Sequence, residues 1–142
     1  MLLFDTNLLV YFVNKDSPFH FRCKKLMDRV VKGKLRACLA QQNLVEFIHV
    51  VTDPRQMEKH LLLPKALAEA EKFHQLFRII SPLESTAEEL FNLIGKKSKL
   101  GKGKIFDLYL AATMLSNGVG TIYTFNASDF KDVPGITVKK PL

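Results

Sequence analysis

Short uninterrupted apolar segments alternate along the chain with longer segments whose apolar residues recur at helical spacing. A continuous apolar run of a few residues is typical of a strand that is buried on both faces of a parallel sheet. Such runs predict core strands at residues 2–4, 35–40, 77–80 and 121–124, and an edge strand at 136–138.

The longer segments have the pattern of helices packed on one side. In the segment 18–32, Phe19, Cys23, Leu26 and Val30 fall on one helical face. Thr86-Ala87-Glu88-Glu89 matches a capping box and predicts the start of another helix. Helices are expected over residues 7–13, 18–32, 41–52, 64–76, 86–97 and 105–116.

The alternation of strands and helices predicts an α/β fold. We expect a central parallel sheet of four to five strands with helices on both faces, which is a three-layer α/β/α arrangement. Residues 1–142 are expected to form a single domain. In such sheets, ligands bind beyond the carboxyl ends of the strands, so the chemistry is expected there.

Charge and composition narrow the class of partner. The chain has 21 Lys and Arg against 14 Asp and Glu, a formal charge of +7, which favours a nucleic acid. Cys23 and Cys38 are isolated, so a zinc site is not indicated and both are expected to be buried and reduced. Neither a signal peptide nor a membrane span is evident, and a cytoplasmic protein is expected.

Three carboxylates interrupt apolar sequence. Asp5 ends Leu-Leu-Phe-Asp, Glu46 lies within Leu-Val-Glu-Phe-Ile, and Asp107 lies within Ile-Phe-Asp-Leu-Tyr-Leu. An ionised carboxylate beside a core is unfavourable unless a cation or hydrogen-bond donors compensate it. Asp129 follows the last core strand and is expected at the same end of the sheet. Oxygen ligands without clustered His or Cys favour Mg²⁺ or Mn²⁺.

Each carboxylate also has a structural explanation. Asp5 is able to cap the following helix, Asp107 suits a helix N-terminus, and Glu46 is able to pair with a Lys or Arg. A single shared cation accounts for all three positions at once, and this is the interpretation that we prefer.

The order and spacing of four segments resemble the PIN-domain nucleases, most closely the VapC-type toxins of toxin–antitoxin modules. The resemblance extends over essentially the whole chain. The segments are residues 4–9 (FDTNLL), 42–47 (QNLVEF), 106–112 (FDLYLAA) and 124–130 (TFNASDF).

The resemblance implies that Asp5, Glu46 and Asp107 are metal ligands. Many family members have an acidic residue at the position of Asn126, which is neutral here. Asp129 is therefore either the fourth catalytic ligand or a residue that contacts the ligands without binding the metal. Polar residues beside the family's site correspond to Thr6, Asn7, Thr124 and Asn126.

The implied activity is hydrolysis of RNA phosphodiester bonds with Mg²⁺ or Mn²⁺. The implied partners are an RNA substrate, a homodimer mate and an antitoxin whose apolar helix covers a groove. A basic segment precedes Asp107, and its Lys99, Lys102 and Lys104 either contact RNA phosphates or form a solvated loop. The alternatives are an RNA-processing PIN nuclease without an antitoxin and a non-catalytic PIN-fold binding protein.

Overall fold

A five-stranded parallel sheet forms the centre of the structure, a computed structural model that describes residues 1–97 and 99–141. The strand order is β3-β2-β1-β4-β5, and every neighbouring pair is parallel. The strands are β1 (Leu2–Phe4), β2 (Ala37–Ala40), β3 (Arg78–Ile80), β4 (Thr121–Tyr123) and β5 (Thr137–Lys139). The predicted parallel sheet is confirmed.

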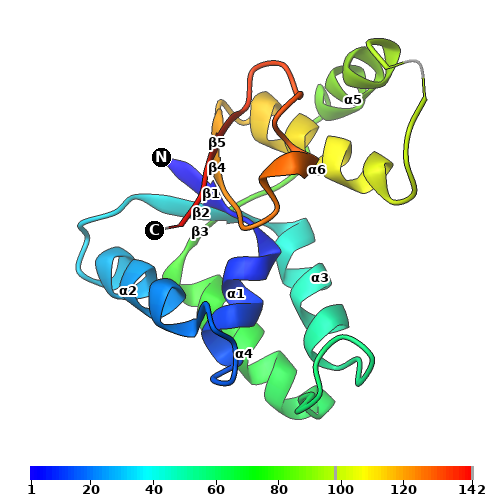
Figure 1. Cartoon of the computed structure of the whole chain (residues 1–142). Coiled ribbons are helices and arrows are strands. Elements are labelled where there is room, and N and C mark those ends of the chain that lie inside the picture. Colours follow the sequence, from blue (N-terminus) through cyan, green and yellow to red (C-terminus); the bar gives the residue numbers. More distant parts are fainter. Residues whose placement is uncertain (98, 142) are drawn as a thin grey trace.

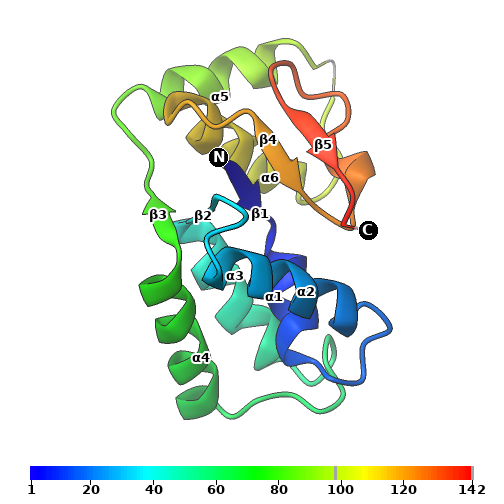
Figure 2. The same cartoon turned by 90° about the vertical axis from the view of Figure 1, so that its left-hand side faces the viewer.

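Helices cover both faces of this sheet, as Figures 1 and 2 show. One layer contains α1 (Thr6–Val13), α2 (His20–Val31), α3 (Gln41–Val51) and α4 (Leu63–Leu76). The opposite layer contains α5 (Thr86–Gly95) and α6 (Lys104–Ser116). The predicted three-layer α/β/α fold is therefore confirmed.

The strands are apolar throughout because both of their faces are covered. Successive side chains of a strand point to opposite faces. Phe4 accordingly packs with the core beneath α1 and α3, whereas Leu3 packs with Met114 of α6. In β2, Leu39 belongs to the first of these cores and Cys38 to the second.

The two cysteines are separated by the sheet. Cys23 lies in the core on the α1 side and Cys38 in the core on the α6 side, and both are buried and free of a disulfide, as predicted. Burial raises the pKa of Cys23 to about 12 and that of Cys38 to about 11, so both stay thiols at neutral pH.

Element boundaries differ from the prediction by a few residues. The helix expected from residue 18 begins at His20, because the Ser17 hydroxyl accepts a hydrogen bond from Phe19 N and forms a turn ahead of it. The strand expected from residue 35 begins at Ala37. Within the described residues, all helices fall short of the length and apolarity that a bilayer span requires.

The capping box predicted at Thr86 is wrong. The residue that precedes α5 is Ser85, and its side chain makes no capping bond. Thr86 is buried instead. Its hydroxyl accepts a hydrogen bond from Leu83 N at 2.8 Å and shares a second with Ser116 Oγ at 2.6 Å, which ties α5 to the end of α6. The Thr86 hydroxyl, which the sequence pattern assigned to a helix cap, therefore makes a tertiary contact instead.

The Thr86 hydroxyl should contribute measurably to stability. Replacing Thr86 with Val keeps the shape but leaves Leu83 N and Ser116 Oγ without this partner, so we expect a loss of about 1–3 kcal/mol in the free energy of unfolding. Urea denaturation measures it. The other member of the supposed box provides the control: Glu89→Met, whose side chain cannot make the capping bond, should change the value by less than about 0.5 kcal/mol. Equal losses in the free energy of unfolding for both variants would instead support the predicted capping box.

Candidate active site

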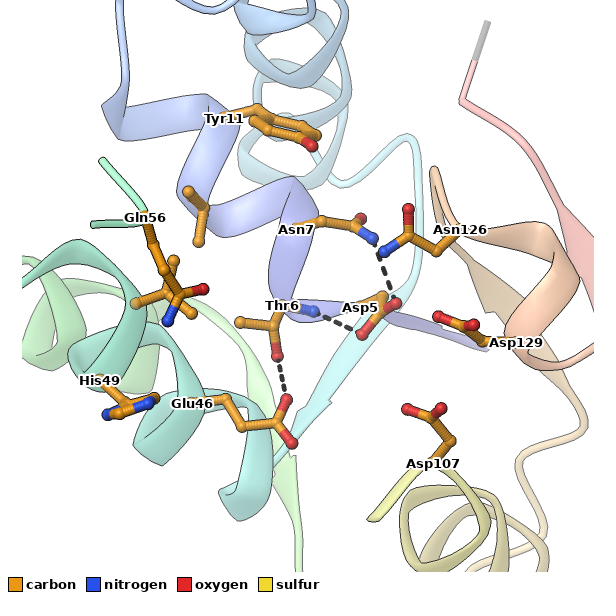
Figure 3. A pocket seen from close by; sticks show the side chains of 12 residues that line it. Asp5, Thr6, Asn7, Tyr11, Glu46, His49, Gln56, Asp107, Asn126 and Asp129 are labelled. Carbon is orange, nitrogen blue, oxygen red and sulfur yellow. Dashed lines mark hydrogen bonds between the residues drawn. The ribbon is translucent and has the colours of Figure 1, made fainter. Parts of the chain in front are cut away.

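Four carboxylates from distant parts of the chain line one open cavity of about 380 Å³. Asp5 follows β1, Glu46 lies in α3, Asp107 lies in the first turn of α6, and Asp129 ends the short 3₁₀ helix η1 (Ala127–Asp129). Figure 3 shows the four side chains around the cavity. Asp5, Glu46 and Asp129 come together because β1 lies between β2 and β4, so the segments that follow these parallel strands emerge at the carboxyl end of the sheet. Asp107 joins them because α6 runs back to the start of β4, which leaves the first turn of this helix at the same end.

Asp5 is held by neutral donors at both carboxylate oxygens. Thr6 N donates to Oδ1 at 2.8 Å, and Thr124 Oγ1 donates to Oδ2 at 2.7 Å. Asn7 Nδ2 lies 3.3 Å from the same Oδ2. Asp5 thereby caps α1 and also points into the cavity, so the cap and a site role are compatible (Figure 3).

Glu46 is also oriented at both oxygens. Thr6 Oγ1 donates to Oε2 at 2.8 Å, and Gln42 Nε2 donates to Oε1 at 2.7 Å. The Lys or Arg partner considered from the sequence is not found, since no ion pair among the described residues involves any of the four cavity carboxylates. The negative charge of the cavity is therefore not neutralised by salt bridges within the described chain.

Polar residues around Asp5 form one connected network. Asn7 Nδ2 donates to Thr124 Oγ1 at 3.1 Å, and Asn7 Oδ1 accepts a bond from Phe125 N at 3.3 Å. The backbone N–H of Asn126 donates to Thr124 Oγ1 at 3.0 Å, while the Asn126 side chain lines the cavity. This network fixes the position of the loop after β4 relative to the start of α1.

The pKa of Asp5 reflects its surroundings. Burial raises it to about 6. That value includes the hydrogen bonds from Thr124 and Thr6, which lower the pKa, and the negative charges of Glu46 and Asp129, which raise it. Asp5 is only 8% exposed, so burial outweighs its donors.

The pKa of Asp107 is raised as well. Burial raises it to about 6, and the neighbouring charge of Asp129 adds to the shift, while Lys104 lowers it. Asp5 and Glu46 also contribute repulsion. Two carboxyls with raised pKa values in one cavity mark a place where a cation would relieve repulsion.

The donor set of the cavity fits a hard divalent cation. Carboxylate oxygens are what Mg²⁺ and Mn²⁺ prefer, and the four carboxylates face a common space. As they stand, no three His, Cys, Asp or Glu side chains of residues 1–97 and 99–141 are close enough to share one ion. Like charges without a counter-ion repel one another, so a closer approach of these carboxylates would require the cation.

The basic segment before α6 divides into two kinds of lysine. Lys99 and Lys102 are exposed. Lys104 begins α6, its amine donates to the backbone carbonyl of Asp129, and it lies 6.0 Å from the centre of the Phe130 ring. Lys99 and Lys102 are therefore the better candidates for contact with phosphates.

Sequence reasoning assigned no role to Gln42, Asn43 and His49. Gln42 contacts Glu46, and His49 lines the cavity. Asn43 is fully buried, accepts a bond from Ala40 N at 2.8 Å and donates to Thr6 Oγ1 at 3.1 Å. Their spacing from Glu46, three or four residues along one helix, was the available signal, because such residues share a helical face.

Comparison with known proteins identifies the family. The model of the PIN domain family matches residues 2–136, so the chain belongs to this family. It is similar to Ribonuclease VapC48 of Mycobacterium tuberculosis, with 25% identity over 139 residues that cover 97% of this chain and 95% of the relative.

Solved structures share the fold. The VapBC2 structure from Rickettsia felis, bound to a DNA fragment from its promoter, has a TM-score of 0.71 at 17% identity and covers 98% of this chain and 97% of that chain. A toxin–antitoxin complex from Klebsiella pneumoniae has a TM-score of 0.63 at 19% identity, covering 100% and 98%. At these identities the likeness establishes the fold alone.

The raised carboxyl pKa values should make the stability of the metal-free protein depend on pH. A carboxyl with a pKa of about 6 when folded, against the usual 3.8, binds its proton more tightly in the folded state. Its ionisation therefore destabilises the fold as pH rises through that interval. We expect the free energy of unfolding without metal to increase as pH is lowered from about 7 to about 5.

Urea denaturation in EDTA at both pH values measures this effect. Asp107→Asn, which cannot ionise, should show a smaller increase than the parent. Asp28→Asn, a change at an exposed aspartate of α2, should retain the parent's increase. A parent whose stability falls on acidification in this range, with the same slope in Asp107→Asn, would contradict the expectation.

Proposed function

We propose that this chain is a Mg²⁺- or Mn²⁺-dependent ribonuclease that hydrolyses RNA phosphodiester bonds and acts as the toxin of a toxin–antitoxin pair. The observation that carries the proposal is the meeting of Asp5, Glu46, Asp107 and Asp129 at one cavity, with neutral donors around them. The similarity to a protein named Ribonuclease VapC48 supports RNA as the substrate.

Asp5, Glu46 and Asp107 are the residues that would hold the cation, with Asp129 as the fourth. Once bound, the cation lowers the pKa of a water molecule and neutralises charge on the scissile phosphate. In the hydrolysis, the water oxygen would bond to phosphorus and give up a proton, the bond from phosphorus to one ester oxygen would break, and that ester oxygen would take up a proton. Without the cation the carboxylates repel the phosphate, so activity should require it.

The chain's own residues orient the carboxylates. Thr124 and Asn7 fix the Oδ2 of Asp5, and Thr6 fixes an oxygen of Glu46. These donors hold the carboxylates before substrate arrives, which reduces the reorganisation needed for the reaction.

The cavity also has room for a nucleotide beside the scissile phosphate. Beyond the carboxylates it continues along α1 and α3 to Tyr11, His49 and Gln56 (Figure 3). An aromatic ring and polar side chains of this kind are able to stack against a base and form hydrogen bonds to it. We place the RNA along this arm and across the exposed Lys99 and Lys102.

An antitoxin and a homodimer mate complete the proposal. The similar structure from Klebsiella pneumoniae is a toxin–antitoxin complex, which supports a protein partner. A second cavity of about 350 Å³ between α1, α2 and α4 is lined by the apolar side chains of Phe12, Val13 and Leu61 together with Lys15, His20, Lys24, Lys65 and Glu69. The three apolar side chains suit the apolar face of an amphipathic antitoxin helix, whose polar flanks would meet the charged residues. An RNA substrate agrees with the cytoplasmic location expected from the sequence.

Replacing Asp5 with Asn tests the site directly. Asn keeps the size but removes the charge, so RNA cleavage in Mg²⁺ should fall by about 100-fold or more. EDTA should abolish cleavage by the parent, and Mn²⁺ should restore it. Asp28→Asn is the matched control and should cleave like the parent. Cleavage by Asp5→Asn at the parent's rate would remove Asp5 from the site.

The same variants separate the alternative functions. A toxin should arrest growth when it is expressed in bacterial cells, and Asp5→Asn should not. An RNA-processing nuclease would cleave RNA without arresting growth. A non-catalytic PIN-fold binding protein would neither cleave RNA nor bind Mn²⁺ in a titration.

Lys99 and Lys102 should contribute to RNA binding. Each lysine that contacts a phosphate releases counter-ions, so replacing both with Gln should reduce the slope of log affinity against log salt by about 1.4. Binding of a catalytically inactive Asp5→Asn parent to single-stranded RNA at several salt concentrations measures this slope. Lys24→Gln with Lys25→Gln on α2 is the control of equal charge. If both pairs leave the slope unchanged, Lys99 and Lys102 do not contact RNA.

A further inference from the structure

Gln42 links the two helices that carry Glu46 and Asp107. Its Nε2 lies 2.7 Å from Oε1 of Glu46 and 3.0 Å from the backbone carbonyl oxygen of Phe106. Gln42 and Glu46 are one turn apart in α3 and share a helical face. Phe106 directly precedes Asp107 in the first turn of α6, so a single amide group contacts both neighbourhoods.

This link passes from one layer of the fold to the other. α3 packs on one face of the sheet and α6 on the opposite face (Figures 1 and 2). The second oxygen of Glu46 is held by Thr6, which accepts a hydrogen bond from the buried Asn43. With Gln42 on the first oxygen, the Glu46 carboxylate is fixed at both ends.

The hydrogen-bond pattern defines the orientation of the Gln42 amide. Its neighbours at Nε2, a carboxylate and a carbonyl, both accept, so the NH₂ group must face them. Oε1 then points the other way, where it is buried and has no hydrogen-bond partner among the described residues.

An unpartnered buried acceptor is unfavourable by about 1–3 kcal/mol. An apolar side chain of similar size at position 42 would avoid that loss. Packing and stability alone therefore do not account for a glutamine here, whereas its two donated bonds do.

We propose that Gln42 is a positioning residue that sets the separation of the Glu46 carboxylate from the turn carrying Asp107, so that both are able to reach the same divalent cation. This inference rests on the proposed metal-dependent function. Lys104, in the same turn, donates through its amine to the backbone carbonyl of Asp129. Gln42 differs from Lys104 in that it donates directly to one of the carboxylates.

Gln42→Met removes both hydrogen bonds while keeping the length of the side chain. Gln41→Met is the matched control, because Gln41 is the exposed neighbour at the start of α3 and its side chain makes no hydrogen bond within the described chain. Mn²⁺ affinity is measured by calorimetry and by the EPR signal of free Mn²⁺, alongside the melting temperature and the kinetics of RNA cleavage.

We expect Gln42→Met to keep the parent's melting temperature and to weaken Mn²⁺ binding by about 10- to 100-fold. Its kcat should fall by a similar factor, while KM for RNA changes by less than about twofold. Gln41→Met should match the parent in every measurement. Parent-like Mn²⁺ affinity and kcat in Gln42→Met would overturn the positioning role.

Two further comparisons separate this inference from its premises. If Gln42→Met lowers the melting temperature, the experiment uses Gln42→Asn instead. The shorter amide stays polar but cannot reach both acceptors. Parent-like Mn²⁺ binding by Gln42→Asn overturns the inference. A parent that neither binds Mn²⁺ nor cleaves RNA overturns the proposed function together with the role of Gln42. A parent that does both, beside an unaffected Gln42 variant, overturns the role of Gln42 alone.

Discussion

Repulsion among carboxylates at the carboxyl end of the parallel strands is the constraint on which the rest of the site depends. Asp5 is buried, and the charges of Glu46, Asp107 and Asp129 face the same cavity. Separate anions would move apart in solution, but here the backbone prevents it. The residues that follow β1, β2 and β4 emerge together, and the helix that leads into β4 begins beside them. The fold thus holds charges near one another that have no favourable direct interaction.

The hydrogen-bond donors that surround these carboxylates are neutral, so the negative charge of the site is kept. Thr6, Thr124, Asn7 and Gln42 orient oxygens without cancelling their charge. A lysine or arginine in the same places would have formed a stable ion pair and removed the attraction for a metal. Among the described residues, the cavity lining contains no Lys or Arg, whereas Lys99 and Lys102 of the segment before α6 are exposed. The net positive charge of the chain therefore favours a polyanion without neutralising the site.

The sequence predicted those parts of the structure that are indicated by a pattern among a few neighbouring residues. Uninterrupted apolar runs indicated the strands, and a carboxylate within such a run stood out because burial of a charge is costly. Gln42 gave no such signal, because a polar residue in the first turn of a helix looks like ordinary solvated surface, and its partner Phe106 is 64 residues away. The capping box predicted at Thr86 was wrong for the same reason, because Ser116, 30 residues away, forms a hydrogen bond with the Thr86 hydroxyl.

The division of the site between the layers has a consequence for its dynamics. Glu46 and Asp107 are carried by helices on opposite faces of the sheet, and the turn with Asp107 follows a segment containing Gly101 and Gly103. Gly103 adopts φ of +76°, a conformation that favours glycine, immediately before α6 begins. Loosening of this segment would separate Asp107 from the other carboxylates while the sheet stayed intact. The role proposed for Gln42, whose hydrogen bonds cross between the layers, is therefore to keep the site assembled in a molecule that is already folded.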